Sequence, residues 1–280
     1  MENINMIIAN PIYDVSFKRL LENDKVAKFI IGTILDCKVL SLEPVYNEYT
    51  IFNETKDRLT LFRKDFSATI KTKEGEKRVI IEMQKAKKLG DIARFRDYLG
   101  NEYSKSSLPI IAIYILGFNL KVDSPAFVAR PECFDLRTKK KIEGKDRFVE
   151  HLTHNTYFIQ TLRIKSSLNT KLDSLLAIFE QDKFIGTDTT TKIFPFDVND
   201  KDLKEVLKVL QYAAADAETR KELDLENIYL KSIEDMFGEK DAIIAQKDEV
   251  IAQKEDIITK QDNELAKLAE EIAKLKKLLS

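Results

Sequence analysis

The chain has 280 residues, of which 44% are hydrophobic and 33% are charged, and its formal net charge is −1. This length accommodates one sizeable domain with an appendage, or two small domains, and the near-neutral balance argues against a uniformly basic nucleic-acid-binding protein. Two isolated cysteines, Cys37 and Cys133, argue against a disulfide scaffold and favour a reducing compartment.

Hydropathy and the N-terminal residues indicate where the protein is expected. No apolar run approaches the roughly 20 residues that a membrane span requires. The opening residues MENINMIIANPIYD lack the basic and apolar regions of a signal peptide. We therefore expect a soluble, cytoplasmic protein that makes no membrane contact.

The first 165 residues are predicted to alternate between helices and strands. A helix is expected over 14–31, because Phe17, Leu20 and Leu21 recur at helical spacing. Asp14 or Ser16 can cap its amino end. The continuous apolar run at 109–118 predicts a strand buried on both faces, which implies a layered α/β core. The other predicted elements are a strand at 59–66, hairpin arms at 67–72 and 77–84, a helix at 89–105, and short strands near 126–136 and 155–164.

The second half of the chain is predicted to be mainly helical. Within residues 166–236, Leu203, Val206, Leu207 and Leu210 form one apolar stripe at helical spacing. Beyond residue 238 there is no aromatic residue, glycine or proline, and charged residues dominate.

The tail contains an internal repeat with a period of seven residues. IIAQKDE, VIAQKED and IITKQDN follow one another from residue 243, and apolar residues recur every seven positions, at Ile244, Ile251, Ile258, Leu265, Ile272 and Leu279. This period predicts a coiled coil, so we expect self-association through residues 243–279, most simply as a dimer. A lone charged helix is the alternative interpretation.

Local charge differs from the overall balance. Between residues 63 and 96 there are eleven Lys or Arg and five Asp or Glu. Such an excess suits contact with a phosphate backbone, and a solvated lysine-rich surface is the alternative.

The predicted hairpin carries the polar residues of greatest chemical interest. A turn centred between Glu74 and Gly75 would place Asp65 opposite Gln84 and Ser67 opposite Glu82. All four side chains would then project from one face. A carboxylate within the apolar string VIIEMQ is costly to bury unless it binds something.

Two carboxylates on neighbouring strands can hold Mg²⁺ or Mn²⁺, because these ions prefer oxygen ligands. Such an ion activates water and stabilises charge at a phosphate. The arrangement fits the pattern D-x(n)-E-x-K, with Gln84 at the lysine position. An amphipathic hairpin with one polar face fits the same spacing.

The strings DVSFKRLL, LTLFRKDFSATI, VIIEMQKAK, DIARFRDYLGNEY, PIIAIYILGF and FVEHLTHNTYFIQT resemble the PD-(D/E)xK nuclease superfamily. More closely, they resemble its Rpn/YhgA-like group, the nuclease-family transposases. The likeness covers residues 12 to about 165. It implies a restriction-endonuclease-like mixed sheet flanked by helices over 1–165. The residue patterns themselves predict a mainly helical extension over 166–236 and a coiled-coil tail over 237–280.

The resemblance also implies roles for individual residues. Asp65 and Glu82 would bind Mg²⁺ or Mn²⁺, and Gln84 would occupy the position where many members carry lysine. The residues expected to contact DNA are Lys64, Lys85, Lys87, Arg94 and Arg96. Asp14 and Lys18 match the N-terminal D-x-x-F-K helix of the group, either as an accessory part of the site or in helix capping.

The expected function is metal-dependent DNA cleavage linked to recombination, mobile elements or defence. The alternative is a catalytically inactive nuclease-fold protein that acts as a DNA-binding or coiled-coil assembly module. Gln84 in the lysine position keeps this alternative open.

Overall fold

The computed structural model describes residues 6–45, 66–85, 91–144 and 146–278. The chain divides into two units, Met1–Tyr229 and Leu230–Ser280. Residues on both sides of position 165 belong to the first unit, whereas the described residues of the second unit form a single helix.

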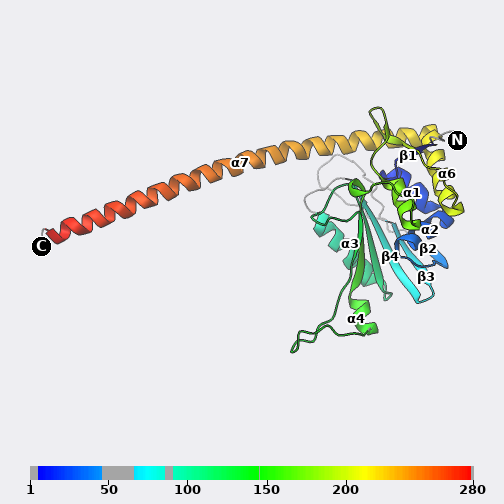
Figure 1. The fold of residues 1–280 in the computed structure, drawn as a ribbon, viewed down its shortest axis with the longest axis horizontal. Helices are drawn as coiled ribbons and strands as arrows, with labels where there is room; N and C mark the ends of the chain where they lie inside the picture. Colours follow the sequence, from blue (N-terminus) through cyan, green and yellow to red (C-terminus); the bar gives the residue numbers. More distant parts are fainter. Residues whose placement is uncertain (1–5, 46–65, 86–90, 145, 279–280) are drawn as a thin grey trace. The chain divides into compact units, whose positions relative to one another are not determined.

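The centre of the first unit is a six-stranded mixed sheet with the order β2-β3-β4-β5-β7-β6 (Figure 1). β4 pairs in parallel with β5, and β5 pairs in parallel with β7, while the outer pairs are antiparallel. The strands are β2 (Ser41–Val45), β3 (Phe66–Thr72), β4 (Gly75–Gln84), β5 (Ile110–Leu116), β6 (Ala126–Ala129) and β7 (His154–Gln160). This confirms the predicted α/β class and the burial of the central strand on both faces, since every residue of β5 is buried.

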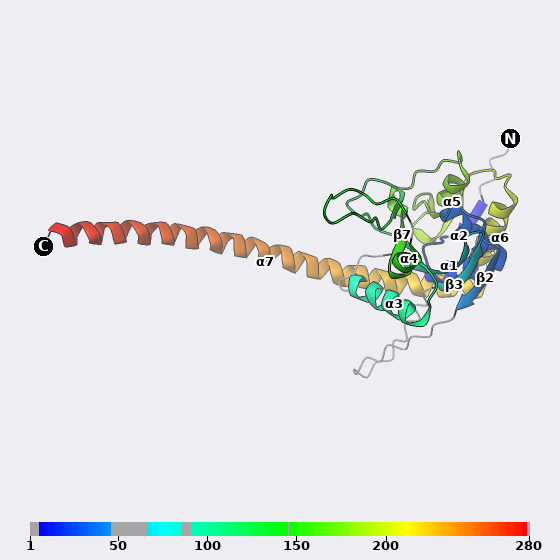
Figure 2. The same cartoon turned by 90° about the horizontal axis from the view of Figure 1, so that it is seen from below.

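Helices lie against both faces of this sheet (Figure 1). α1 (Asp14–Glu22), α2 (Asp24–Ile34), α5 (Lys171–Phe179) and α6 (Lys201–Ala215) contribute to one apolar cluster with the sheet residues Ile81 and Ile113. α5 lies beside α2 (Figure 2). α3 (Asp91–Lys105) packs on the opposite face, where Phe95 and Leu99 contact Tyr114 and Leu116.

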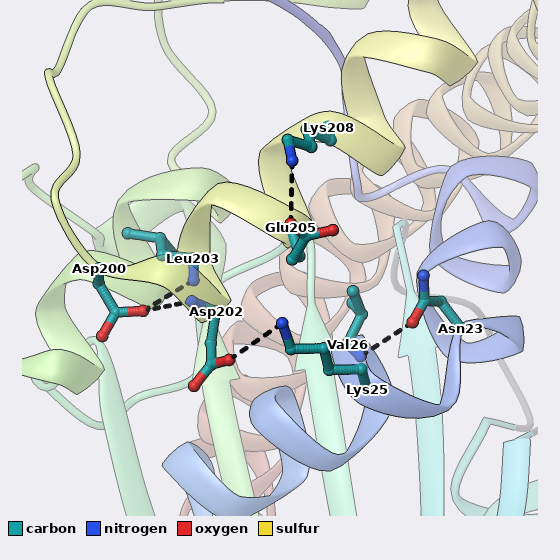
Figure 3. A network of polar contacts seen from close by, with 8 residues as sticks. All are labelled: Asn23, Lys25, Val26, Asp200, Asp202, Leu203, Glu205 and Lys208. Carbon is teal, nitrogen blue, oxygen red and sulfur yellow. Dashed lines mark hydrogen bonds and ion pairs between the residues drawn. The ribbon is translucent and has the colours of Figure 1, made fainter.

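The predicted helix over 14–31 is in fact two helices. The chain leaves helical geometry at Asn23, whose side chain accepts a hydrogen bond of 3.2 Å from the Val26 backbone and so begins α2 (Figure 3). An asparagine at this position competes for the backbone donors of a continuous helix. α6 begins in the same way, because Asp200 accepts bonds from the backbone of Asp202 and Leu203.

Residues 166–236 also contain strands that the sequence pattern did not predict. β8 (Phe184–Ile185) and β9 (Asp188–Phe194) join β1 (Met6–Ala9) in a second sheet with the order β1-β9-β8. The pairing of β1 with β9 joins the first described strand to a strand that follows it by about 180 residues. The remaining elements are α4 (Arg147–Leu152), a 3-10 turn (Thr161–Arg163) and α7 (Ala217–Leu278).

α7 is one helix of 62 residues that contains the predicted tail as far as Leu278. Among the described residues, no helix combines the length and apolarity needed to cross a membrane.

A buried ion pair fixes α3 to the sheet. Arg78 Nε of β4 donates to Glu102 Oε2 of α3 at 2.6 Å, and Arg78 also donates to Thr69 Oγ1 of β3 at 3.3 Å. Both charged side chains are almost completely buried. Removing one partner would leave the other charge uncompensated in the interior.

We predict that Glu102→Leu lowers the free energy of unfolding by about 3–5 kcal/mol, because it leaves the Arg78 guanidinium buried without its carboxylate. The double variant Arg78→Met/Glu102→Leu should recover most of this loss. Urea unfolding followed by circular dichroism measures both. Glu205→Gln, which removes the exposed Lys208–Glu205 pair, is the control and should change stability by less than about 1 kcal/mol. Equal losses in the single and double variants would contradict the prediction.

Candidate active site

Two polar side chains are buried near the carboxyl end of β4. Glu82 is 4% exposed and Gln84 is 2% exposed. They lie two residues apart on one strand, so they project from the same face. On the parallel neighbour β5 their partners are Tyr114 and Leu116.

The carboxyl ends of β4 and β5 approach each other very closely beyond this pair. The Gly117 backbone N–H donates to the Gln84 carbonyl at 2.7 Å. A Cβ atom at position 117 would lie 2.2 Å from the Lys85 carbonyl oxygen, so only glycine fits there. The carboxyl edge of parallel strands is the usual place for ligands in α/β proteins.

The register of the β3–β4 hairpin differs from the prediction by two residues. Thr72 pairs with Gly75 around a two-residue turn, and Ser67 therefore lies opposite Ile80 rather than opposite Glu82. A two-residue turn matches the twist of the strands, and Gly75 adopts φ +123°. Side chains alternate between the two faces of a strand, so a register shift of two residues leaves each side chain on the face predicted for it. Ser67, Glu82 and Gln84 therefore still share one face.

This shared face, which we call the polar face, is defined by Ser67, Thr69, Arg78, Glu82 and Gln84. α3 covers part of it through the Arg78–Glu102 pair and through the Phe95 ring, whose centroid lies 4.9 Å from that of Tyr114. The opposite face of the same strands contributes apolar side chains to the main core, among them Ala68, Val79 and Ile81. The buried charged and amide side chains of β4, Arg78, Glu82 and Gln84, thus all lie on one side of the sheet.

Several predicted site residues lie outside the described residues. Asp65, Lys64 and Lys87 are among them, and the Arg94 side chain is not described although its backbone belongs to α3. Within the described ranges, no group of three or more His, Cys, Asp or Glu side chains is arranged to hold a metal ion. The binding of Mg²⁺ or Mn²⁺ by Asp65 and Glu82 together therefore stays a prediction.

The predicted residues Arg96, Lys18 and Asp14 are described and lie on two helices, α3 and α1. Arg96 is exposed on α3. Lys18 is exposed on α1 and lies 3.7 Å from Glu22. Asp14 is the first residue of α1, and Tyr13 occupies the N-cap position before it.

No protein-family model, no curated protein and no solved structure matches this chain. The nuclease family therefore stays a prediction made from the sequence motifs quoted above.

Lys85 enters a polar cluster at the start of α1. Its ammonium donates to the Tyr13 hydroxyl at 2.8 Å and lies 4.0 Å from the centroid of that ring. The Tyr13 hydroxyl also contacts Thr189 of β9 and Asn227 of α7, each at 2.8 Å. Lys85 lies on the side of β4 opposite to Gln84, as strand alternation requires, and is half-buried.

Glu226 of α7 is a functional candidate that the sequence analysis missed. Its carboxylate accepts hydrogen bonds from the backbone N–H groups of Asp14 at 2.8 Å and Val15 at 3.2 Å. It thus caps α1 from more than 200 residues away, where we expected Asp14 or Ser16 to do so. The helix dipole favours a negative charge at this end.

The ionisation of Glu226 is strongly perturbed. Burial, and after it the nearby Asp14 carboxylate, raise the pKa of this carboxyl, while the two backbone hydrogen bonds and Lys85 lower it; the net result is a pKa of about 7. No local sequence signal distinguishes Glu226 from the other acids of α7. Only its position in the fold gives it this environment.

We predict that Glu226 makes the protein less stable as the pH rises from about 4.5 to about 7. In that window the unfolded chain loses the proton while the folded chain retains it, because the pKa is raised on folding. The contribution amounts to at most about 3 kcal/mol. Thermal unfolding of wild type and Glu226→Gln at pH 5 and pH 8 measures it, and the variant should lose less stability between these values.

Glu222→Gln is the matched control, since Glu222 is an exposed glutamate one turn earlier on α7. It should retain the pH dependence of wild type. Identical pH profiles for wild type and Glu226→Gln would show that the carboxyl ionises normally.

Proposed function

We propose that this chain is a metal-dependent DNA endonuclease in which Asp65 and Glu82 bind Mg²⁺ or Mn²⁺ and Gln84 orients the attacking water. The observation that carries the proposal is the burial of Glu82 and Gln84 side by side near the carboxyl edge of β4. A carboxylate supplies the hard oxygen ligand that these ions prefer. Buried carboxylates in proteins are usually paired or coordinate a metal.

The pairing of the strands gives a second line of support. Phe66 and Ile81 are the last described partners of the β3–β4 ladder. In the sequence, Asp65 directly precedes Phe66, and Glu82 directly follows Ile81. This adjacency supports a common role for the two carboxylates, which is also the role implied by the family resemblance.

Each residue then has a distinct task in phosphodiester hydrolysis. The bound metal would polarise the phosphate and lower the pKa of a water molecule. The Gln84 amide can donate a hydrogen bond to that water and accept one from it. Unlike a lysine, the amide does not carry a proton that it can exchange at neutral pH, so Gln84 acts in positioning alone.

We predict that Glu82→Gln lowers the rate of plasmid cleavage by at least about 100-fold, because several kilocalories per mole of charge stabilisation at the phosphate depend on the metal. Conversion of supercoiled plasmid to nicked and linear forms, with Mg²⁺ or Mn²⁺ and with a chelator, measures the rate. Asp65→Asn should have a similar effect, and Gln84→Ala a smaller one.

Glu76→Gln is the control, because Glu76 is an exposed carboxylate on the same strand at the other end of the hairpin. It should cleave at the wild-type rate. Equal cleavage by wild type and Glu82→Gln, with similar melting temperatures, would support the inactive DNA-binding alternative instead.

The exposed apolar residues of α7 favour a second, compatible role in assembly. In the single chain, Ile251, Ile258, Leu265 and Ile272 are each more than half exposed, and they recur every seven residues. A repeat of this kind is buried when an identical helix packs against it. We therefore propose that residues 243–279 join two copies of the chain, which would present two nuclease units to one duplex.

We predict that Ile251→Asp/Ile258→Asp converts a dimer into a monomer, since each aspartate would place a charge in the buried seam. Light scattering coupled to size exclusion measures the mass. Gln246→Asp/Gln253→Asp is the matched control, because both glutamines lie two residues beyond a seam position and are exposed. A monomeric wild type would rule out the assembly role.

A further inference from the structure

A hairpin arm protrudes beyond the edge strand β6. The arm, defined here as residues 130–144, leaves β6 and precedes α4 (Figure 1). Every residue of the arm except Asp135 is exposed, so the arm is not held by packing against the core. Its shape must therefore come from local hydrogen bonds.

These local bonds are well formed. Phe134 pairs with Lys141 in an antiparallel bridge, and the Ile142 N–H donates to the Cys133 carbonyl at 2.9 Å. At the turn, the Asp135 carboxylate accepts from the backbone of Arg137 at 2.9 Å and of Thr138 at 2.7 Å. Hydrogen bonds that an aspartate carboxylate accepts from the backbone N–H groups that follow it commonly stabilise a turn. The arm is thus a built structure that presents its side chains outward.

The side chains on the arm are both apolar and basic. Phe134 and Ile142 are about half exposed, and Leu136 near the turn is 85% exposed. Lys141 is paired with Glu132 at 2.6 Å, and Arg137 lies 3.9 Å from Asp135. Arg130, Lys139 and Lys140 form no ion pair with another described residue.

α4 extends the same exposed region. None of its six residues is buried, and Phe148 and Leu152 are each more than 60% exposed. A contiguous set of exposed large apolar side chains usually marks an interaction site.

The charges on the arm select among the possible occupants. A second copy of the arm would bring like charges together, which opposes self-pairing. An anionic polymer would neutralise Arg130, Lys139 and Lys140. Apolar side chains such as Leu and Phe, when they accompany basic residues, can enter a groove and insert between base steps.

We propose that the arm binds duplex DNA, with Lys139 and Lys140 on the phosphates and Phe134 and Leu136 inserted as an apolar wedge. The inference rests on the proposed function and names a second contact of the same substrate. Because β6 is antiparallel to β7, the arm leaves at the amino end of β7, whereas Glu82 and Gln84 lie near the carboxyl edge. The seven residues of β7 separate these edges by about 20 Å. One turn of a duplex is longer, at about 34 Å, so one duplex can reach both.

The experiment measures binding of a labelled 30-base-pair duplex by fluorescence anisotropy, with a chelator present so that cleavage plays no part. Lys139→Glu/Lys140→Glu should weaken binding by at least about tenfold. Affinity falls as salt rises, and in this variant the steepness of that fall, the magnitude of the slope of log affinity against log salt concentration, should decrease by about two. This is one for each lost phosphate contact. The control Lys204→Glu/Lys221→Glu reverses two exposed lysines of α6 and α7 and should bind as wild type.

A second pair of measurements tests the wedge. Phe134→Ser/Leu136→Ser should weaken binding while leaving the salt slope unchanged, and it should reduce DNA bending detected by energy transfer between the duplex ends. All these positions are exposed, so the variants should melt at the wild-type temperature, which circular dichroism checks.

The outcomes separate this inference from the proposed function. If wild type binds the duplex and the arm variants bind it equally well, the arm proposal fails while the nuclease proposal stands. If the arm variants lose binding but Glu82→Gln cleaves normally, the arm proposal stands and the catalytic one fails. If the arm variants lose binding to vesicles of anionic phospholipid but not to the duplex, the arm proposal is overturned in favour of a membrane. If the Ser variants change the mass measured by light scattering, it is overturned in favour of a second copy of the chain.

Discussion

The parallel pairing of β4 with β5, and of β5 with β7, constrains the rest of the first unit. Parallel strands occur where both faces of the sheet are covered, so each face must present side chains that tolerate burial. One face meets this requirement with aliphatic residues packed under α1, α2, α5 and α6. The other face buries Arg78, Glu82 and Gln84, and it is covered in part by α3, which supplies Glu102 as a counter-charge.

This asymmetry explains why the candidate site lies where it does. A charged or amide side chain is expensive to bury on an apolar face, but it can be kept on a face that already contains hydrogen-bonding partners. The Arg78–Glu102 pair joins α3 to the polar face where β5 begins, and the polar side chains Glu82 and Gln84 continue the same face toward its carboxyl edge. The buried ion pair and the proposed site thus use the same face of one strand.

The amino end of α1 shows a second kind of dependence, between segments far apart in the sequence. Glu226 supplies the acceptors for the first N–H groups of α1, and Tyr13 links Lys85, Thr189 and Asn227. The first turns of α7 are therefore connected, through Tyr13 and Lys85, to the edge of the sheet that carries Gln84. A proton on Glu226 is favoured by its burial, so this attachment responds to pH in a range close to neutrality.

The sequence by itself determined the features that depend on local periodicity. An unbroken apolar run predicted β5, alternation placed Glu82 and Gln84 on one face, and a sevenfold repeat marked the tail, which lies in one helix. Tertiary structure decided what depends on contacts between distant segments: the β1–β9 pairing, the ion pair between β4 and α3, and the capping of α1 by Glu226. It also corrected the hairpin register by two residues and showed the exposed arm, because turn geometry and side-chain exposure depend on the folded backbone rather than on residue type.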